Sequence, residues 1–155
     1  MAPIFTSTQH SDVRETIALA KYAESVGVQG IQVGPTYYYG TMDDDVVRLF
    51  ELVSGQVKDI PLMIYNTWWN APHMKPALLR RLAEIPNVVS LKWSAPSIEE
   101  FYQGLWDLSD QFAIVDNNFM LLVSHPLGAT SWITHIAGFW PEFSLAIQDA
   151  LDEGD

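Results

Sequence analysis

Residues 60–94 have the sequence "IPLMIYNTWWNAPHMKPALLRRLAEIPNVVSLKWS", in which two hydrophobic patterns alternate. Near the two ends of this stretch, residues 60–66 and 88–92 form short apolar runs that are typical of buried strands. Between them the chain has helical periodicity from about Lys75 to Ile85. A strand, a helix and a second strand in this order predict a parallel βαβ unit, because parallel strands need a crossover connection.

The same alternation extends over the whole chain. Asp12 and Glu15 have the spacing of a capping box at the start of one helix, and Thr41 can cap the next. The predicted strands are residues 3–8, 30–33, 60–66, 88–92, 112–118 and 130–136. The predicted helices are residues 11–27, 42–53, 75–85, 97–109, 118–128 and 141–155. We find no linker, so the sequence predicts one domain over residues 1–155, of the α/β class with a mostly parallel sheet.

Two architectures fit this alternation: an open doubly wound sheet, or part of a (β/α)8 barrel. A nucleotide-binding doubly wound sheet should have a glycine-rich turn after its first strand, but residues 6–12, "TSTQHSD", contain no glycine. Polar and aromatic residues instead follow several different strands, as the active sites of barrels require. The pattern therefore favours a barrel. Since a closed barrel has eight strands and the sequence indicates about six, we expect an incomplete one.

The composition excludes several classes of protein and of site. The chain has 155 residues, 48% of them hydrophobic, which suits one globular domain. Its formal net charge of -11 argues against binding to nucleic acid or to an anionic membrane. It has no cysteine, and its histidines lack metal-ligand spacing, so we expect no metal site. The first residues, "MAPIFTSTQH", do not have the pattern of a signal peptide, so we expect a cytoplasmic protein.

Lys92 ends a predicted strand whose core is Val88, Val89 and Leu91, and Trp93 follows it directly. The other lysines fall on predicted helices or beside them. Burial makes the charged form of an amine costly, which lowers its pKa and leaves some of it as a neutral nucleophile. Lys92 is therefore a candidate for Schiff-base chemistry. The alternative is a lysine that reaches water or an ion-pair partner from the end of its strand.

Tyrosines follow two other predicted strands. Tyr65 ends the strand before the one with Lys92, so in a barrel its hydroxyl could lie on the same rim and relay protons to the amine. It could equally pack its ring and leave its hydroxyl in water. Tyr37, Tyr38 and Tyr39 are adjacent in a loop, so they cannot all face one site. Loop packing or a subunit contact is the alternative for them.

Several segments together resemble the dihydrodipicolinate synthase and N-acetylneuraminate lyase family of class I aldolases. "GIQVGPTYYYG" (30–40) resembles its strand and P-x-Y-Y loop, and "IPLMIYN" (60–66) resembles its strand that ends in Y-N. "LAEIPNVVSLKWS" (82–94) resembles the segment that carries the family's lysine. "FAIVDNN" (112–118) resembles a stretch that usually ends in G-D-D or D-N, and "LGATSWIT" (127–134) resembles the eighth strand. The matches cover nearly the whole chain in the family's order.

The resemblance implies a TIM barrel and a lyase or aldolase that needs no cofactor. It implies that Lys92 forms a Schiff base with pyruvate or another small 2-oxo acid, and that Tyr65 relays protons at the same carbonyl. It implies that the backbone carbonyl of Ile133 faces the bound keto acid. Tyr37 aligns with the family's loop tyrosine, which contributes across a contact between subunits, and Tyr38 aligns with it after a shift of one residue. This implies a homo-oligomer.

The sequence departs from the family pattern at several positions. Asn70 stands where synthases acting on aspartate semialdehyde carry an arginine, and the bulky Trp68 and Trp69 replace small residues. A different and more apolar second substrate is therefore expected. Trp93 stands where many members have glutamate. The resemblance begins at the third barrel strand, so we expect a fragment without the first two βα units and their keto-acid-binding loop.

Two other functions fit parts of the sequence. A binding or assembly module could retain a segment of the barrel and use its aromatic loops for partner contacts without catalysis. In that case Lys92→Ala would change neither binding nor stability. A doubly wound domain could bind a phosphorylated ligand, although the missing glycine-rich turn disfavours it.

Overall fold

The computed structural model describes residues 3–58 and 60–154. Within them, one six-stranded sheet has the order β1-β2-β3-β4-β5-β6, and every neighbouring pair is parallel. The strands are β1 (Phe5–Ser7), β2 (Gly30–Val33), β3 (Leu62–Tyr65), β4 (Val88–Trp93), β5 (Ala113–Asp116) and β6 (Ala129–Trp132). The prediction of a parallel sheet is confirmed.

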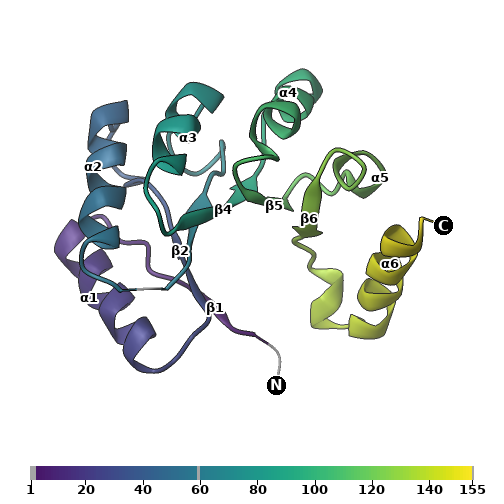
Figure 1. Cartoon of the computed structure of the whole chain (residues 1–155), viewed down its shortest axis with the longest axis horizontal. Coiled ribbons are helices and arrows are strands. Elements are labelled where there is room, and N and C mark those ends of the chain that lie inside the picture. Colours follow the sequence, from purple (N-terminus) through teal and green to yellow (C-terminus); the bar gives the residue numbers. More distant parts are fainter. Residues whose placement is uncertain (1–2, 59, 155) are drawn as a thin grey trace.

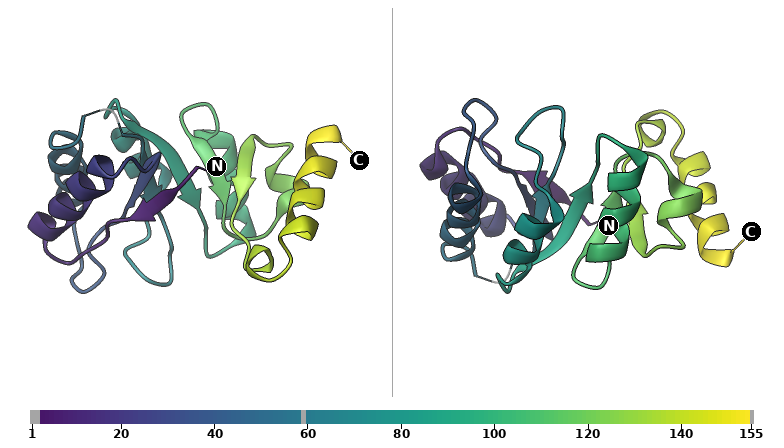
Figure 2. Two further views of the ribbon diagram at one scale, coloured as in Figure 1. Left: turned by 90° about the horizontal axis from the view of Figure 1, so that it is seen from below. Right: turned by 90° about the horizontal axis from the view of Figure 1, so that it is seen from above.

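Helices connect the successive strands. They are α1 (Val13–Ser25), α2 (Asp43–Ser54), α3 (Pro76–Ala83), α4 (Ile98–Leu108), α5 (Leu121–Ser124), the 3-10 helix η1 (Ile136–Gly138) and α6 (Pro141–Glu153). Figure 1 shows α1 to α4 along the outer, convex side of the sheet, with α6 beyond β6 at the far end. Figure 2 shows the same arrangement from below and from above.

The order of the strands decides between the two predicted architectures. In a doubly wound sheet the strand order reverses and helices cover both faces. Here the order follows the chain without reversal, and the sheet curves into an arc with its helices on the convex side (Figure 1). The described residues therefore form an arc of a (β/α)8 barrel, as predicted, with β1 and β6 as its end strands.

The hydrophobic core lies between the sheet and the outer helices. Side chains alternate along each strand, so one set points to the helices and the other to the concave face. In β4, Leu91 and Trp93 belong to the helix-facing set and are fully buried. They form one cluster with apolar side chains of the helices, among them Phe50, Leu79 and Phe101. Each such buried side chain contributes roughly 1.5–3 kcal/mol to folding, which fixes the sheet on its helices.

The start of α2 corrects one prediction. Asp12 caps α1 by accepting from the backbone N–H of Arg14 at 2.9 Å, in line with the sequence. Thr41, however, does not cap α2, whose N-cap is Met42. The backbone N–H of Met42 donates to the carboxylate of Asp45 at 3.1 Å. The prediction for Thr41 was wrong because an aspartate inside the first turn satisfies this end of the helix.

The last strand is shorter than the predicted range of 130–136. It ends at Trp132, and η1 begins at Ile136. The backbone N–H of Ile136 donates to the hydroxyl of Thr134 at 3.0 Å, which starts the turn. Ile133 consequently lies in the segment that follows β6, at the carboxyl end of the sheet.

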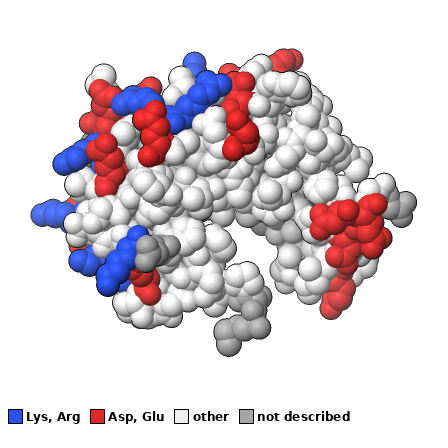
Figure 3. All heavy atoms as spheres, in the orientation of Figure 1, with Lys and Arg blue, Asp and Glu red and all other residues white. Residues whose placement is uncertain are grey.

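Charged side chains lie mainly over the helices. In Figure 3, lysine and arginine side chains gather over α1 to α3, and acidic side chains gather on α6. The atoms that border the opening of the arc are largely uncharged in this view. In the part of the chain that the structure describes, no helix is long and apolar enough to cross a membrane.

Candidate active site

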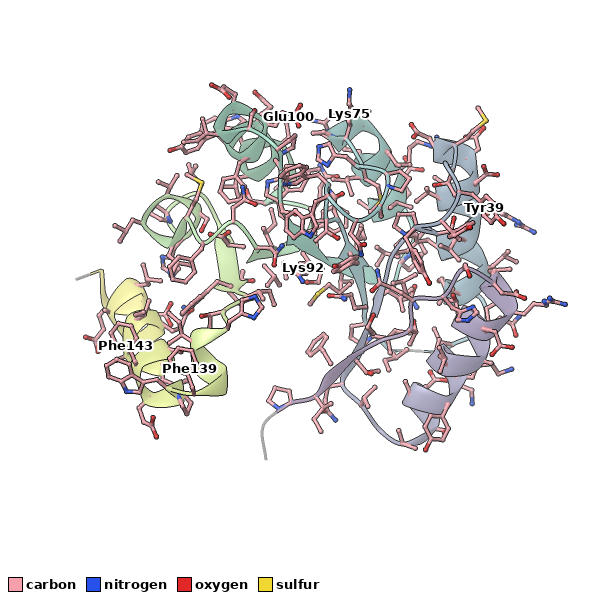
Figure 4. All side chains as sticks on the ribbon, turned by 180° about the vertical axis from the view of Figure 1, so that it is seen from behind. Tyr39, Lys75, Lys92, Glu100, Phe139 and Phe143 are labelled. Carbon is pink, nitrogen blue, oxygen red and sulfur yellow. The ribbon has the colours of Figure 1, made fainter. Side chains whose placement is uncertain are left out.

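The carboxyl ends of the strands lie along one rim of the arc, because all strands run in the same direction. Tyr65, at the end of β3, is paired in register with Lys92 near the end of β4. Lys92 is paired in turn with Val115 of β5. Since Leu91 and Trp93 point to the helices, Lys92 points to the concave face, where Figure 4 labels it.

Lys92 and Tyr65 contact each other at this rim. The Nζ of Lys92 lies 4.8 Å from the centre of the Tyr65 ring, within the range of a cation–π interaction. Lys92 is half-buried, and burial lowers the pKa of its amine from the usual 10.5, with Tyr65 acting more weakly in the opposite direction. None of the ion pairs found among the described residues includes Lys92. The amine therefore loses its proton more readily than a lysine in water.

Trp93 fixes the end of β4 against α4. Its indole is fully buried and donates through Nε1 to the backbone carbonyl of Phe101 at 3.1 Å. The ring fills the space that Gly104 leaves open, because a Cβ at that position would overlap with ring atoms. Lys92 therefore extends from a backbone that is held firmly on its helix-facing side.

The loop after β3 is held at its base by the buried amide of Asn66. This amide donates to the carbonyl of Met74 and accepts from the backbone N–H of Met74, both at 3.1 Å. The hydroxyl of Ser94 donates to the backbone carbonyl of Asn66 at 2.8 Å, which connects the loop to the end of β4. Between these fixed ends, the exposed Trp68 and Trp69 contact each other edge to face at 5.5 Å. The loop thus presents two indoles at the rim from a fixed base.

His73 connects the far side of the same loop to α4. Its Nε2 lies 3.1 Å from Oε2 of Glu100, which is in the first turn of α4. Its ring centre lies 6.0 Å from the ring centre of Trp93, with the two planes inclined at 33°. The loop, the end of β4 and the start of α4 are therefore one connected unit.

Asp116, fully buried at the end of β5, organises the loop that follows. Its carboxylate accepts from the backbone N–H of Asn118 at 2.6 Å, from that of Met120 at 2.9 Å and from the hydroxyl of Ser124 at 2.7 Å. These hydrogen bonds satisfy a charge that would otherwise be costly to bury. Phe119, which lies between Asn118 and Met120 in the chain, has a left-handed backbone with φ of 59°. Asp116 supports the loop and does not face the rim as a free carboxylate.

A hollow of about 390 Å³ lies on the rim. It is lined by Trp69 from the loop after β3, by residues 117–119 after β5 and by residues 133–136 after β6. In the sheet, β4 with Lys92 lies between β3 and β5, so these loops flank the strand that carries the amine. Another hollow, of about 260 Å³, lies between α1, the loop after β2 and α2. Neither Lys92 nor Tyr65 is among the residues that line these two hollows.

Three of the predicted site residues lie at the carboxyl-end rim of the sheet. Lys92 and Tyr65 are in contact, and Ile133 lines the hollow of about 390 Å³. Asn70 is exposed in the loop after β3 and does not line the hollow, whereas its neighbour Trp69 does. At this hollow a tryptophan, and not Asn70, is therefore the lining residue from the loop after β3.

The predicted loop tyrosines lie apart from this hollow. Tyr37 and Tyr38 are 55% and 73% exposed in the loop after β2, and neither lines the hollow. Tyr38 contacts Tyr39 edge to face, with ring centres 4.9 Å apart. Within this chain, the two tyrosines therefore do not contribute to the hollow.

Several residues that shape the rim were not predicted as site residues from the sequence. Asn66 and Asn117 directly follow β3 and β5, and Asp116 is the last residue of β5. These positions at the ends of strands are the signal that could have identified them. His73 and Glu100 are distant in sequence, so no local pattern indicates their contact. Among the described residues, no group of three histidine or carboxylate side chains could hold a metal ion.

Comparison with known proteins identifies the family. Residues 1–155 match the model of the Dihydrodipicolinate synthetase family. The 4-hydroxy-tetrahydrodipicolinate synthase of Synechococcus elongatus is 30% identical over 160 residues, which cover 99% of this chain and 52% of that protein. The putative 2-dehydro-3-deoxy-D-gluconate aldolase YagE of Escherichia coli is 27% identical, with 99% and 52% covered. The chain spans about half the length of these curated relatives.

Solved structures agree with the fold over the same half. Escherichia coli YagE in complex with pyruvate has a TM-score of 0.90 and 27% identity, with 99% of this chain and 53% of that chain covered. Dihydrodipicolinate synthase from Aquifex aeolicus has a TM-score of 0.87 and 25% identity, with the same coverage. With the family model matched from residue 1 to residue 155 and the barrel arc shared with these enzymes, the chain belongs to the dihydrodipicolinate synthetase family.

Proposed function

We propose that the protein acts as a lyase of the aldolase type, in which Lys92 forms a Schiff base with pyruvate or another small 2-oxo acid. The contact between Lys92 Nζ and the ring of Tyr65 at the rim carries this proposal. The lowered pKa of the Lys92 amine supports it, because a Schiff base forms from the neutral amine. The similarity to YagE, whose structure contains pyruvate, supports the choice of substrate.

The first step joins the amine to the keto acid. The lone pair of Lys92 Nζ attacks the carbonyl carbon, and a proton passes from the nitrogen to the former carbonyl oxygen to give a carbinolamine. A second proton then allows the hydroxyl to leave as water, which gives a protonated iminium. Both transfers need a group beside the nitrogen that can donate and accept a proton. We assign this role to the hydroxyl of Tyr65, because its ring lies against Nζ.

The iminium makes carbon–carbon chemistry possible. Its positive nitrogen withdraws electrons from the neighbouring carbon, so a proton can leave that carbon and an enamine forms. The enamine attacks an aldehyde carbon to form the new bond, and the reverse sequence cleaves the same bond. We assign to the backbone carbonyl of Ile133, at the border of the rim hollow, a contact with the bound keto acid.

The proposal includes a contact between copies of the chain. Tyr37 and Tyr38 are exposed in the loop after β2, and exposed aromatic side chains are typical of interfaces. We propose that this loop lies against a second copy in a homo-oligomer. Size-exclusion chromatography with light scattering on Tyr38→Ser should then show a smaller assembly than the unmodified protein does.

The test of the proposed chemistry is chemical trapping. The folded protein is incubated with pyruvate and cyanoborohydride, and its peptides are analysed by mass spectrometry. We expect a reduced pyruvate adduct on the peptide with Lys92, no adduct in Lys92→Ala, and slower trapping in Tyr65→Phe. Lys75, on the N-cap of α3, serves as an internal control for nonspecific modification. An unmodified Lys92 in the folded protein contradicts the lyase and favours the non-catalytic module.

A further inference from the structure

We propose that copies of this 155-residue chain associate head to tail, with α6 of one copy docked into a groove beside β1 and α1 of the next. This inference goes beyond the proposed function and does not depend on the chemistry at Lys92. The two surfaces lie at opposite ends of the arc (Figure 1). Because they differ from each other, the contact is heterologous, and each copy can bind two neighbours.

The first surface is an apolar groove of about 310 Å³ between β1 and α1. Its lining includes four apolar side chains that are 42% to 67% exposed: Ile4, Leu19, Tyr22 and Val26. No residue of β2 lines it, so the groove opens away from the rest of the sheet. β1 is also an end strand, and within the described residues one side of its backbone has no partner strand. This end of the arc therefore offers apolar side chains next to a free strand edge.

The second surface is an aromatic patch at the start of α6. The rings of Trp140 and Phe143 are stacked with their centres 4.6 Å apart, and the two residues are 53% and 40% exposed. Phe139, labelled together with Phe143 in Figure 4, is 77% exposed. Another side of α6 is held to β6, because Trp132 donates through Nε1 to Gln148 at 2.9 Å. A contiguous exposed aromatic patch on a helix that is fixed in this way indicates an interaction surface.

The two surfaces are the two halves of a contact that recurs inside the arc. Each of the helices α1 to α4 connects a strand to its parallel neighbour, and such a crossover lies over the junction of the two strands. α6 follows β6, but among the described residues no strand lies beyond β6. If β1 of a second copy continues the sheet in the same direction, α6 covers the new junction, and the groove beside β1 receives its aromatic patch.

The charges favour this arrangement over a contact between two α6 helices. From Ser94 to its last residue the sequence contains acidic residues but no lysine or arginine, and Figure 3 shows acidic side chains gathered on α6. Two such surfaces would repel each other. Beside the groove, Lys21 is exposed next to Tyr22, and none of the ion pairs found among the described residues includes it. An acidic side chain of α6, such as Asp149, can pair with this ammonium group across the contact.

A complementation experiment tests the contact by analytical ultracentrifugation. One double variant, Trp140→Ser with Phe143→Ser, removes the aromatic patch, and the other, Leu19→Ser with Tyr22→Ser, removes the groove. All four side chains are exposed, so both variants should keep the circular dichroism spectrum of the unmodified protein. Every sample also carries Tyr38→Ser, so that the loop after β2 does not contribute.

The expected result is specific to a head-to-tail contact. The protein with Tyr38→Ser alone should form assemblies that grow with concentration. Each double variant should associate with itself at least about ten-fold more weakly, as the loss of aromatic anchors gives. An equimolar mixture of the two double variants should form a 1:1 heterodimer, because it contains one intact patch and one intact groove. Trp106→Ser, at a position of α4 that is 77% exposed, should leave the association unchanged.

Several outcomes would overturn the proposal. A monomer at every concentration means that no second copy covers these surfaces. A mixture that stays monomeric, or a double variant that associates with itself at full strength, excludes a head-to-tail contact. Lys21→Glu should weaken the association at low salt, whereas Lys75→Glu, at the exposed N-cap of α3, should not. Equal effects of the two charge reversals would show that α6 does not lie beside α1.

Discussion

Lys92 and Tyr65 are partners in register on adjacent parallel strands, and the Nζ of Lys92 lies 4.8 Å from the centre of the Tyr65 ring. Partners in register point to the same face of a sheet, so no loop is needed to bring these groups together. The contact is thus fixed by the pairing of β3 with β4. Substitution of either side chain should therefore change the chemistry at the rim without changing the sheet.

The rate at which pyruvate is trapped at Lys92 should depend on pH in a way that reports the burial of the amine. Burial lowers its pKa from 10.5, so the neutral fraction, and with it the rate, should reach a plateau at lower pH than for a lysine in water. The initial rate of adduct formation is measured across the neutral to alkaline range, with N-acetyl-lysine as the control. Identical profiles for the two amines would contradict the role of burial.

Lys92→Met should stabilise the protein at neutral pH. The lowered pKa means that the folded state binds the proton less tightly than the unfolded state does, so charging Lys92 opposes folding below the lowered pKa. The penalty disappears as the pH rises from the lowered pKa to 10.5. Because Lys92 is half-exposed, we expect a gain of less than about 1 kcal/mol in the free energy of unfolding. Urea denaturation at neutral and alkaline pH should show that gain shrinking as the pH rises. A gain that is constant with pH would point to packing instead.

Gly104→Ala should destabilise the protein through Trp93. Alanine in a helix is normally favoured over glycine by about 1 kcal/mol. Here the added Cβ would overlap with the buried ring of Trp93, and overpacking of a core typically costs about 1–3 kcal/mol. We therefore expect a lower denaturation midpoint and slower trapping of pyruvate at Lys92, which precedes Trp93.

Gly138→Ala is the matched control for this substitution, because nothing lies within 4 Å of a Cβ at that position. It should leave both the midpoint and the trapping rate unchanged. Equal effects of the two substitutions would show that the contact between Gly104 and Trp93 does not position β4.

The alternation of patterns predicted the fold well, because each strand and helix here is specified locally. The apolar run 30–33 matches the observed strand, and the helix predicted over residues 97–109 is observed as Ile98–Leu108, with Ser97 as its N-cap. The ends of helices and strands were predicted less accurately where a side chain accepts a backbone hydrogen bond. At the start of α2, for example, the carboxylate of Asp45 accepts from the backbone N–H of Met42. The shortened last strand has a similar cause, since the hydroxyl of Thr134 accepts the N–H that begins the next turn.

The candidate site could be predicted only where strand ends define it. Lys92 and Tyr65 follow from their strands, and the sheet alone brings them together. The support around them could not be predicted, because it depends on contacts between distant segments. His73 and Glu100, 27 residues apart, meet only after α3 and α4 have packed on the sheet. The position of Trp69 at the hollow likewise depends on a loop whose shape is set by a buried amide.

Asn66→Asp should loosen the loop that carries Trp68 and Trp69. The carboxylate can still accept from the N–H of Met74, but it cannot donate to the carbonyl of Met74, and two acceptors would then face each other in a buried site. An unsatisfied buried polar group costs about 1–3 kcal/mol, so the free energy of unfolding should fall by about that amount. Limited proteolysis should also cut the loop faster, with fragments mapped by mass spectrometry. Asn70→Asp makes the same chemical change at an exposed position of the loop and should alter neither measurement. Equal proteolysis of the two variants would mean that the amide of Asn66 does not hold the base of the loop, and that the position of Trp69 at the hollow has another cause.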